Sequence, residues 1–163
     1  MPIEIERKFL VINSNWKKHV TKTIPIQQGY FCHNETVSAR VRVTDEEASV
    51  NFKSASIGIQ RLEYEYEIPV TDAWEMLKNL CQKPIIEKTR YLVPEDGHTW
   101  EIDVFEAKNA GLIIAELELE NIEQRFNLPD WVDKEVTNDK RYYNPWLCKH
   151  PYQQWPQSTL KES

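Results

Sequence analysis

The chain has 163 residues with 26 acidic and 20 basic side chains, a formal net charge of −6 at pH 7 and three well-separated cysteines. This length suits one domain with a buried core. The net negative charge argues against a nucleic-acid partner. The number and spacing of the cysteines argue against a disulfide framework or a thiolate zinc site. No apolar run approaches the roughly 18 residues of a membrane span, and the charged stretch from Glu4 to Lys8 is unlike a signal peptide, so we expect a cytoplasmic protein without a membrane partner.

Most of the chain alternates between charged and apolar residues, which is the period of strands whose two faces differ. Segments with this pattern lie at residues 3–9, 39–43, 50–53, 61–68, 88–91, 100–104 and 115–120. A further strand is expected to open at Tyr30, just after Gln28 and Gly29. About eight strands are enough to close a barrel, so we predict a mainly β, α+β fold.

Helical segments interrupt the strands. Asp72 is expected to cap a helix along which Trp74, Leu77 and Leu80 recur at helical spacing. Further short helices, turns or connections are expected at residues 14–16, 106–111 and 138–143. With only four glycines and no break in composition, residues 1–163 are predicted to form one domain, ending in a poorly ordered polar tail over about residues 151–163.

Acidic and basic residues are segregated by strand. Carboxylates recur two residues apart at Glu4/Glu6, Glu63/Glu65, Glu101/Asp103 and Glu116/Glu118, and cations at Arg40/Arg42 and Lys88/Arg90, with Lys53 and Arg61 as additional bases. Like charges at this spacing lie about 7 Å apart and repel mildly, so a solvated face gains nothing from repeating them. Convergent carboxylates suit a hard divalent cation such as Mg²⁺ or Mn²⁺, and convergent Arg and Lys side chains suit phosphate oxygens.

Two interpretations of the charged faces are open. In the first, they point to solvent and the apolar faces fill the barrel, as in an ordinary half-solvated sheet. In the second, the charges line a lumen that receives a metal-bound polyphosphate, and the apolar stripes face outward beneath the helices. The sequence has no glycine-rich phosphate loop and no nucleophilic-serine motif, and its histidines are scattered.

The sequence resembles the CYTH superfamily, the triphosphate tunnel metalloenzymes, in its short, single-domain bacterial type. Residues 4–8 match the ExExK signature of that family. The motifs that follow in order, over nearly all of residues 1–147, are Gln28-Gly29-Tyr30, Arg40-Val41-Arg42, Lys53 and residues 61–66, 87–91, 100–105, 115–119 and 135–142. Residues 131–134 and 54–56 depart from the pattern, since frequent glycines are missing there, and residues 145–155 have no match.

This resemblance implies an eight-stranded antiparallel barrel, flanked by several helices, that encloses a charged tunnel. It implies divalent-metal-dependent hydrolysis of a phosphoanhydride bond in a linear triphosphate, with inorganic tripolyphosphate as the leading substrate. The implied ligands of Mg²⁺ or Mn²⁺ are Glu4, Glu6, Glu101, Asp103, Glu116 and Glu118. The implied phosphate-binding residues are Lys8, Arg40, Arg42, Lys53, Arg61, Lys88, Arg90 and Arg141, the last reaching in from a C-terminal segment that closes one tunnel end. Catalytic roles are implied for Glu6, Lys8, Lys88 and Glu63.

Other functions stay open at this point. The same fold could serve a class IV-type adenylate cyclase acting on ATP, a thiamine or nucleoside triphosphatase, or a noncatalytic triphosphate-binding module. Each alternative presents a small polyanion to the same bases, so the sequence does not choose among them. It also leaves open the choice between Mg²⁺ and Mn²⁺ and between a monomer and a homodimer.

Overall fold

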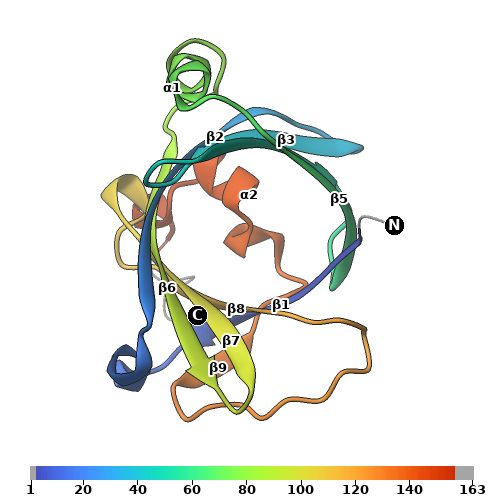
Figure 1. Cartoon of the computed structure of the whole chain (residues 1–163), viewed down its shortest axis with the longest axis vertical. Coiled ribbons are helices and arrows are strands. Elements are labelled where there is room, and N and C mark those ends of the chain that lie inside the picture. The colour runs from blue at the N-terminus through green and yellow to red at the C-terminus, as the bar shows by residue number, and fades with distance from the viewer. Residues whose placement is uncertain (1–2, 157–163) are drawn as a thin grey trace.

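The computed structural model describes residues 3–156, which build a β-barrel seen end-on in Figure 1. Its strands are β1 (Ile3–Val11), β2 (Lys22–His33), β3 (Val37–Val43), β4 (Ala48–Ser54), β5 (Gln60–Glu67), β6 (Ile86–Glu95), β7 (His98–Phe105), β8 (Ile113–Glu118) and β9 (Val132–Glu135). The helices of this range are α1 (Val70–Asn79) and α2 (Asn144–Lys149), with 3-10 turns at Asn15–His19, Ala107–Asn109, Lys140–Tyr142 and Tyr152–Gln154. None of these described helices is long and apolar enough to cross a bilayer.

The barrel closes because β1 pairs with strands on both of its sides. The strand order is β5-β4-β3-β2-β6-β7-β8-β1-β9, and every neighbouring pair is antiparallel. The start of β1 also pairs with β5, where Ile3 faces Leu62, so eight strands form a ring and β9 is an extra strand beside β1. The prediction of an eight-stranded antiparallel barrel is confirmed.

The charged faces of the strands point into the barrel. Lys88 is 2% exposed, Lys8 is 5% exposed and Asp103 is completely buried. Such values are incompatible with a solvated sheet face, since ionised side chains are almost never fully buried without partners. The interpretation with charges on the outside is therefore wrong.

Most outward-facing apolar stripes are covered by other parts of the chain. The turn carrying Trp16 and the segment between β8 and β9, including Trp131, pack on the outer face of β6, β7 and β8. Helix α1 covers β3 through Ala73 and Leu77. The outward residues of β5 stay exposed, contrary to the expectation that helices cover all of these stripes.

The C-terminal segment fills one end of the barrel. Leu147 and Cys148 of α2 form one apolar cluster with inward-facing side chains such as Leu10 and Phe105, and Figure 1 shows α2 inside the ring of strands. Trp155, only 8% exposed, belongs to the same cluster. Aromatic packing holds residues 151–155, the first part of the predicted poorly ordered tail, and residues 157–163 lie outside the described residues.

Two local predictions need correction. Tyr30 lies near the end of β2 rather than at its start, because the strand begins at Lys22 and contains Pro25 and Gly29, which interrupt the alternation. Helix α1 begins after Pro69, so Asp72 lies within the first turn, where its charge favours the helix dipole, and makes no capping hydrogen bond. The turn expected within residues 138–143 is confirmed as Lys140–Tyr142, and Asp139 caps it, since its carboxylate accepts a hydrogen bond from the Arg141 backbone N–H.

Candidate active site

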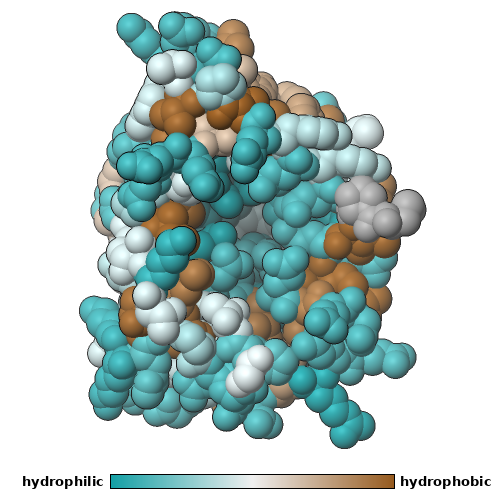
Figure 2. Space-filling view, in the orientation of Figure 1, coloured by the Kyte–Doolittle hydropathy of each residue, from teal (hydrophilic) through white to brown (hydrophobic). Residues whose placement is uncertain are grey.

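A single polar cavity inside the barrel gathers the predicted site residues. We call it the lumen, and Figure 2 shows its hydrophilic entrance. The predicted residues that line it are Glu4, Glu6, Lys8, Arg40, Arg42, Lys53, Arg61, Glu63, Lys88, Arg90, Glu101, Glu116 and Glu118. Its other lining residues are Tyr30, Ser38, Asn51, Glu65, Tyr143, Asn144 and Pro145. Of the predicted set, only Asp103 and Arg141 do not line it.

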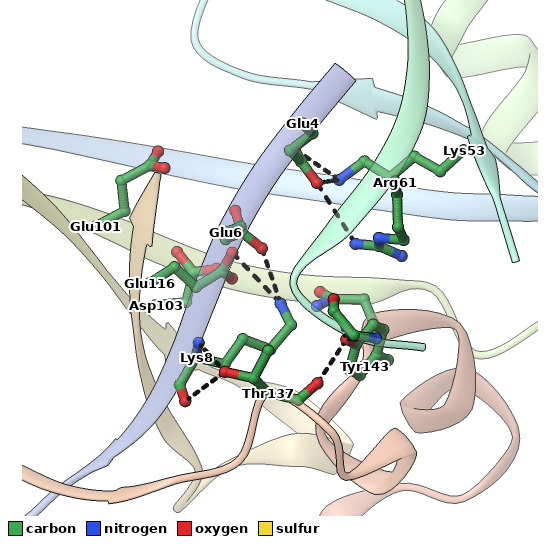
Figure 3. A network of polar contacts seen from close by, with 12 residues as sticks. Glu4, Glu6, Lys8, Lys53, Arg61, Glu101, Asp103, Glu116, Thr137 and Tyr143 are labelled. Carbon is green, nitrogen blue, oxygen red and sulfur yellow. Dashed lines mark hydrogen bonds and ion pairs between the residues drawn. The ribbon is translucent and has the colours of Figure 1, made fainter. Parts of the chain in front are cut away.

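The first wall of the lumen is built by β1 and β8. Strand alternation points Glu6 and Lys8 inward, and the antiparallel register sets Glu6 opposite Glu118 and Lys8 opposite Glu116. The Lys8 Nζ lies 3.2 Å from Glu6 Oε1 and 3.4 Å from Glu116 Oε2 (Figure 3). Burial alone would lower the pKa of Lys8 and raise that of Glu6, but the Glu116 and Glu6 carboxylates outweigh burial at Lys8, and the Lys8 ammonium outweighs it at Glu6. The pKa of Lys8 rises, and the pKa of Glu6 falls to about 2.

The second wall is organised around one buried carboxylate, Asp103. It accepts hydrogen bonds from Lys88 Nζ at 2.8 Å and from Arg90 Nε at 2.8 Å, while Arg90 Nη1 also donates to Glu101 at 2.8 Å. Although burial opposes it, the two bases hold the pKa of Asp103 below its ordinary value. Asp103 does not line the lumen, and its contacts fix Lys88 and Arg90. Its role as a metal ligand stays a prediction.

Lys53 links acidic residues from two other strands. Its Nζ donates to both Glu4 oxygens, at 3.0 and 3.1 Å, and lies 3.3 Å from Glu63. Arg61 Nη2 lies 3.5 Å from the same Glu4 carboxylate. Burial, together with the neighbouring Arg40 guanidinium, lowers the pKa of Lys53.

Two arginines of β3 lack sufficient negative charge around them. The Arg40 Nε is buried and has no hydrogen-bond partner among the described residues. Burial and the cations Arg40 and Arg90 lower the pKa of Arg42. A buried, unsatisfied cationic donor costs free energy, and an anion such as a phosphate group would supply the missing acceptor.

Carboxylates are in excess on the β1, β7 and β8 side of the lumen. Burial and the nearby Glu4 and Glu6 carboxylates raise the pKa of Glu118. Burial raises the pKa of Glu101 to about 7; the Arg90 guanidinium opposes this shift, and Glu116 adds to it. Carboxylates that repel one another in a buried site fit a bound cation.

The donor set fits Mg²⁺ or Mn²⁺, although the carboxylates are now ion-paired. Within residues 3–156, no three or more His, Cys, Asp or Glu side chains converge closely enough to hold a metal by themselves. Instead, the Lys8 ammonium lies between Glu6 and Glu116. It supplies the positive charge that the two carboxylates share. Mg²⁺ commonly needs only one or two protein carboxylates, with substrate phosphates and water completing its coordination.

Arg141 does not reach into the lumen. Its guanidinium binds the Asp139 carboxylate at 2.7 and 3.0 Å and lies in a separate pocket with Trp146 and Trp155. Its binding of substrate phosphate stays a prediction, because the structure places its guanidinium outside the lumen. The reason is local: the turn Lys140–Tyr142 directs Arg141 back toward the residue that caps it.

Tyr143, Asn144 and Pro145 of this segment line the lumen, and the first two contact its bases. The Asn144 Oδ1 accepts hydrogen bonds from Lys88 Nζ at 3.0 Å and from Gln28 Nε2 at 3.2 Å. The Tyr143 ring centre lies 5.0 Å from Lys8 Nζ and 5.0 Å from the Arg61 guanidinium carbon, within cation–π range. No sequence pattern placed these two residues in the site, because their contacts depend on how the C-terminal segment enters the barrel.

Other missed residues did carry a signal. Asn51, Ser38 and Glu65 each lie two positions from a predicted lumen residue on the same strand, so strand alternation points them inward too. Asn51 Nδ2 donates to Glu63 at 3.1 Å and to Glu65 at 2.9 Å, which orients both carboxylates. Extending the two-residue period to uncharged polar side chains would have found Ser38 and Asn51, and the Glu63/Glu65 pair already indicated Glu65.

Comparison with known proteins agrees with this geometry. Residues 2–144 match the CYTH domain family. An inorganic triphosphatase of Acetivibrio thermocellus is 48% identical over 149 residues, covering 91% of this chain and 95% of that protein. An inorganic triphosphatase of Nitrosomonas europaea is 38% identical over 150 residues, covering 89% and 96%. The crystal structure of the inorganic triphosphatase NE1496 aligns with a TM-score of 0.64 at 35% identity, covering 89% of this chain and 93% of that one.

Proposed function

This chain belongs to the CYTH domain family, and on that premise we propose that its lumen is the active site of a divalent-metal-dependent inorganic triphosphatase. The enzyme hydrolyses one phosphoanhydride bond of tripolyphosphate, adding water and releasing pyrophosphate and orthophosphate. One observation carries the proposal: buried bases and buried carboxylates converge on a single cavity, where both sets remain incompletely neutralised. Both relatives described above are inorganic triphosphatases, which supports the same activity.

The bases of the lumen bind and orient the substrate. Guanidinium groups offer forked donors to phosphate oxygens, and ammonium groups act as point charges. The residues that we assign to this role are Lys8, Arg40, Arg42, Lys53, Arg61, Lys88 and Arg90. Arg40 is the leading candidate, because its buried Nε already lacks an acceptor among the described residues.

The carboxylates of β1 and β8 are proposed to hold the metal. We assign Glu4, Glu6, Glu116 and Glu118 to this role, with Glu101 beside them. A bound Mg²⁺ or Mn²⁺ supplies positive charge to the phosphate oxygens and to the leaving group. Lys8, which lies between Glu6 and Glu116, would offer its ammonium group to a phosphate oxygen if these carboxylates held the cation.

Positioning and charge neutralisation account for most of the catalysis, because phosphoryl transfer leaves little covalent work for a protein. Glu6 is a weak base with a pKa of about 2, so a role as charged ligand suits it better than proton transfer. Glu101 lines the lumen beside the carboxylates of β1 and β8, and we assign it to position the attacking water. We therefore expect Glu101→Gln to lower kcat by about 10²-fold or more; an unchanged kcat would contradict this role.

This cavity fits a triphosphate with an organic group less well than it fits inorganic tripolyphosphate. Its lining is almost entirely charged or amide-bearing, with Tyr30, Ser38, Tyr143 and Pro145 as the exceptions. A cyclase needs a pocket for adenine, and no residue set of the lumen forms one.

Glu63 is paired with Lys53 and is proposed to orient this base rather than to bind the metal.

A substrate panel tests the proposed function. Purified protein is incubated with tripolyphosphate, ATP or thiamine triphosphate in Mg²⁺ or Mn²⁺, and orthophosphate, pyrophosphate and cyclic AMP are measured. We expect the highest kcat/KM for tripolyphosphate, no cyclic AMP and no turnover in excess EDTA. Cyclic AMP as the main product, or tight binding without turnover, would overturn the proposal. A cytoplasmic location and the lack of a nucleic-acid partner stay predictions from the sequence.

A further inference from the structure

One side of the barrel carries large apolar side chains in contact with solvent. We call it the β4–β5 face, and it consists of Ile3, Phe52, Leu62, Tyr64 and Tyr66. These side chains are between 39% and 58% exposed. The strand register sets Phe52 opposite Tyr64 and Ile3 opposite Leu62, so they form one continuous surface. Figure 2 shows hydrophobic residues gathered on the side where β5 lies in Figure 1.

This face differs from the other outward faces of the barrel. Elsewhere in residues 3–156, the outward stripes of β6 to β8 lie beneath Trp16 and Trp131, and β3 lies beneath α1. The outward positions of β4 and β5 also carry no charge: Lys53, Arg61, Glu63 and Glu65 line the lumen, and Glu67, exposed at the end of β5, lies at the same alternation as these residues. Solvent-facing strands normally carry polar or charged residues as protection against association, so an uncharged, half-exposed aromatic surface indicates a contact surface.

We propose that the β4–β5 face binds a second copy of this chain, forming a two-fold symmetric dimer. The largest apolar patch of a monomer is often functional, and these five side chains, each at least 39% exposed, form one contiguous patch. A stable interface needs about 800 Å² from each partner, so the patch supplies its apolar centre. The uncharged rim residues Ser54 and Gln60 extend it, and tyrosine is among the residue types enriched at interface centres.

Charge favours a second copy over a different partner. The chain has a net charge of −6, so two copies repel unless they meet through a surface free of carboxylates. The β4–β5 face is such a surface, and it is self-complementary because uncharged residues meet uncharged residues. A basic partner would find no acidic residue on it. Two sheets packed face to face through alternate side chains, about 10 Å apart, provide the geometry.

Sedimentation velocity from low to high micromolar concentration tests the proposal, with Tyr64→Lys and Tyr66→Lys as the disrupting variants. We expect the wild-type protein to be a dimer and each variant to raise the dissociation constant by about 30-fold or more. The matched control is Ile122→Lys, since Ile122 is similarly exposed, at 54%, but lies in the loop after β8. Tyr64→Thr keeps strand propensity and adds no charge, so it supplies a second test if a lysine variant misfolds.

Each outcome decides the proposal. A wild-type dimer that Tyr64→Lys, Tyr66→Lys and Tyr64→Thr weaken, while Ile122→Lys leaves it intact, supports it. A wild-type monomer at every concentration overturns it, whatever else binds the face. A dimer that persists unchanged in the folded Tyr64 and Tyr66 variants also overturns it, because the contact would then lie elsewhere.

Discussion

Glu6 on β1 and Glu118 on β8 stand directly opposite each other across an antiparallel ladder. Like charges in this position destabilise a sheet, and burial and neighbouring carboxylates, Glu6 among them, raise the pKa of Glu118. The fold therefore retains an electrostatic cost at the place where we assign a divalent cation. Functional sites commonly keep such unfavourable arrangements, which ligand binding relieves.

Removing one charge of this pair should stabilise the metal-free protein. We expect Glu118→Gln to raise the melting temperature in EDTA by about 2–4 °C, equivalent to about 1 kcal/mol for a chain of this size. It should also lose most of the additional stabilisation that Mg²⁺ with tripolyphosphate gives to the wild-type protein. Differential scanning fluorimetry measures both effects. The control is Glu35→Gln in the exposed β2–β3 turn, and full ligand stabilisation of Glu118→Gln would rule out the ligand role.

Arg40 should matter for substrate binding but not for folding. Because its buried Nε has no partner among the described residues, we expect Arg40→Met to leave the stability of the ligand-free protein unchanged or higher. The KM for tripolyphosphate should rise tenfold or more, since about 1.5–3 kcal/mol is typical of hydrogen bonds to charged groups. Steady-state kinetics measure this change. Arg7→Met, which removes a guanidinium paired with Glu135 outside the lumen, should keep the wild-type KM; an unchanged KM in Arg40→Met would refute the assignment.

Asn144 should act as a positioning residue for Lys88. Its amide oxygen accepts one of the two hydrogen bonds that hold the Lys88 ammonium, the other going to Asp103. We expect Asn144→Ala to lower kcat/KM for tripolyphosphate about tenfold, which corresponds to about 1.4 kcal/mol, near the value of one charge-assisted bond. Asn15→Ala, at an exposed turn, is the control. Wild-type kinetics in a folded Asn144→Ala protein would show that the contact is incidental.

Glu101 should give the metal-free protein a characteristic pH dependence. Its pKa is about 7 in the folded state against an ordinary value of 4.5. Between these values the unfolded chain has released the proton that the folded protein retains, so stability falls as pH rises from about 4.5 to 7. The glutamine of Glu101→Gln does not titrate, so the variant does not lose this stability. The difference in melting temperature, variant minus wild type, should therefore increase from about pH 4.5 to 7 and be constant above pH 7. Thermal scans in EDTA measure this difference, and a constant difference would show that the pKa of Glu101 is not raised.

Much of the barrel could be predicted from the sequence, because strand alternation is local. The two-residue alternation around Glu4, Glu6 and Lys8 indicates that these three charges share one face of a strand. The alternation does not indicate whether that face points into the barrel or to solvent, since a solvated sheet has the same two-residue period. The repetition of like charges and the resemblance to a known family favoured the inside, and the burial of Lys88 confirms it.

What the sequence missed depends on tertiary packing. Arg141 and Asn144 are three residues apart, yet only Asn144 enters the lumen, because a short turn and the seating of Trp155 decide which way each side chain points. The outer face of β5 looks like any other apolar stripe in the sequence. Its exposure follows from where α1 packs, and no local pattern specifies that contact.

The most direct test of the account is the rate of tripolyphosphate hydrolysis in Mg²⁺ by the wild-type protein and by Glu116→Gln. Glu116 lies at the meeting point of Lys8 and Arg90, so its loss should disturb both the cation and the bases. We predict that the wild-type protein releases pyrophosphate and orthophosphate in equal amounts, and that the folded variant is slower by about 100-fold or more. Equal rates in the two proteins, or no hydrolysis by the wild-type protein, would contradict a catalytic lumen.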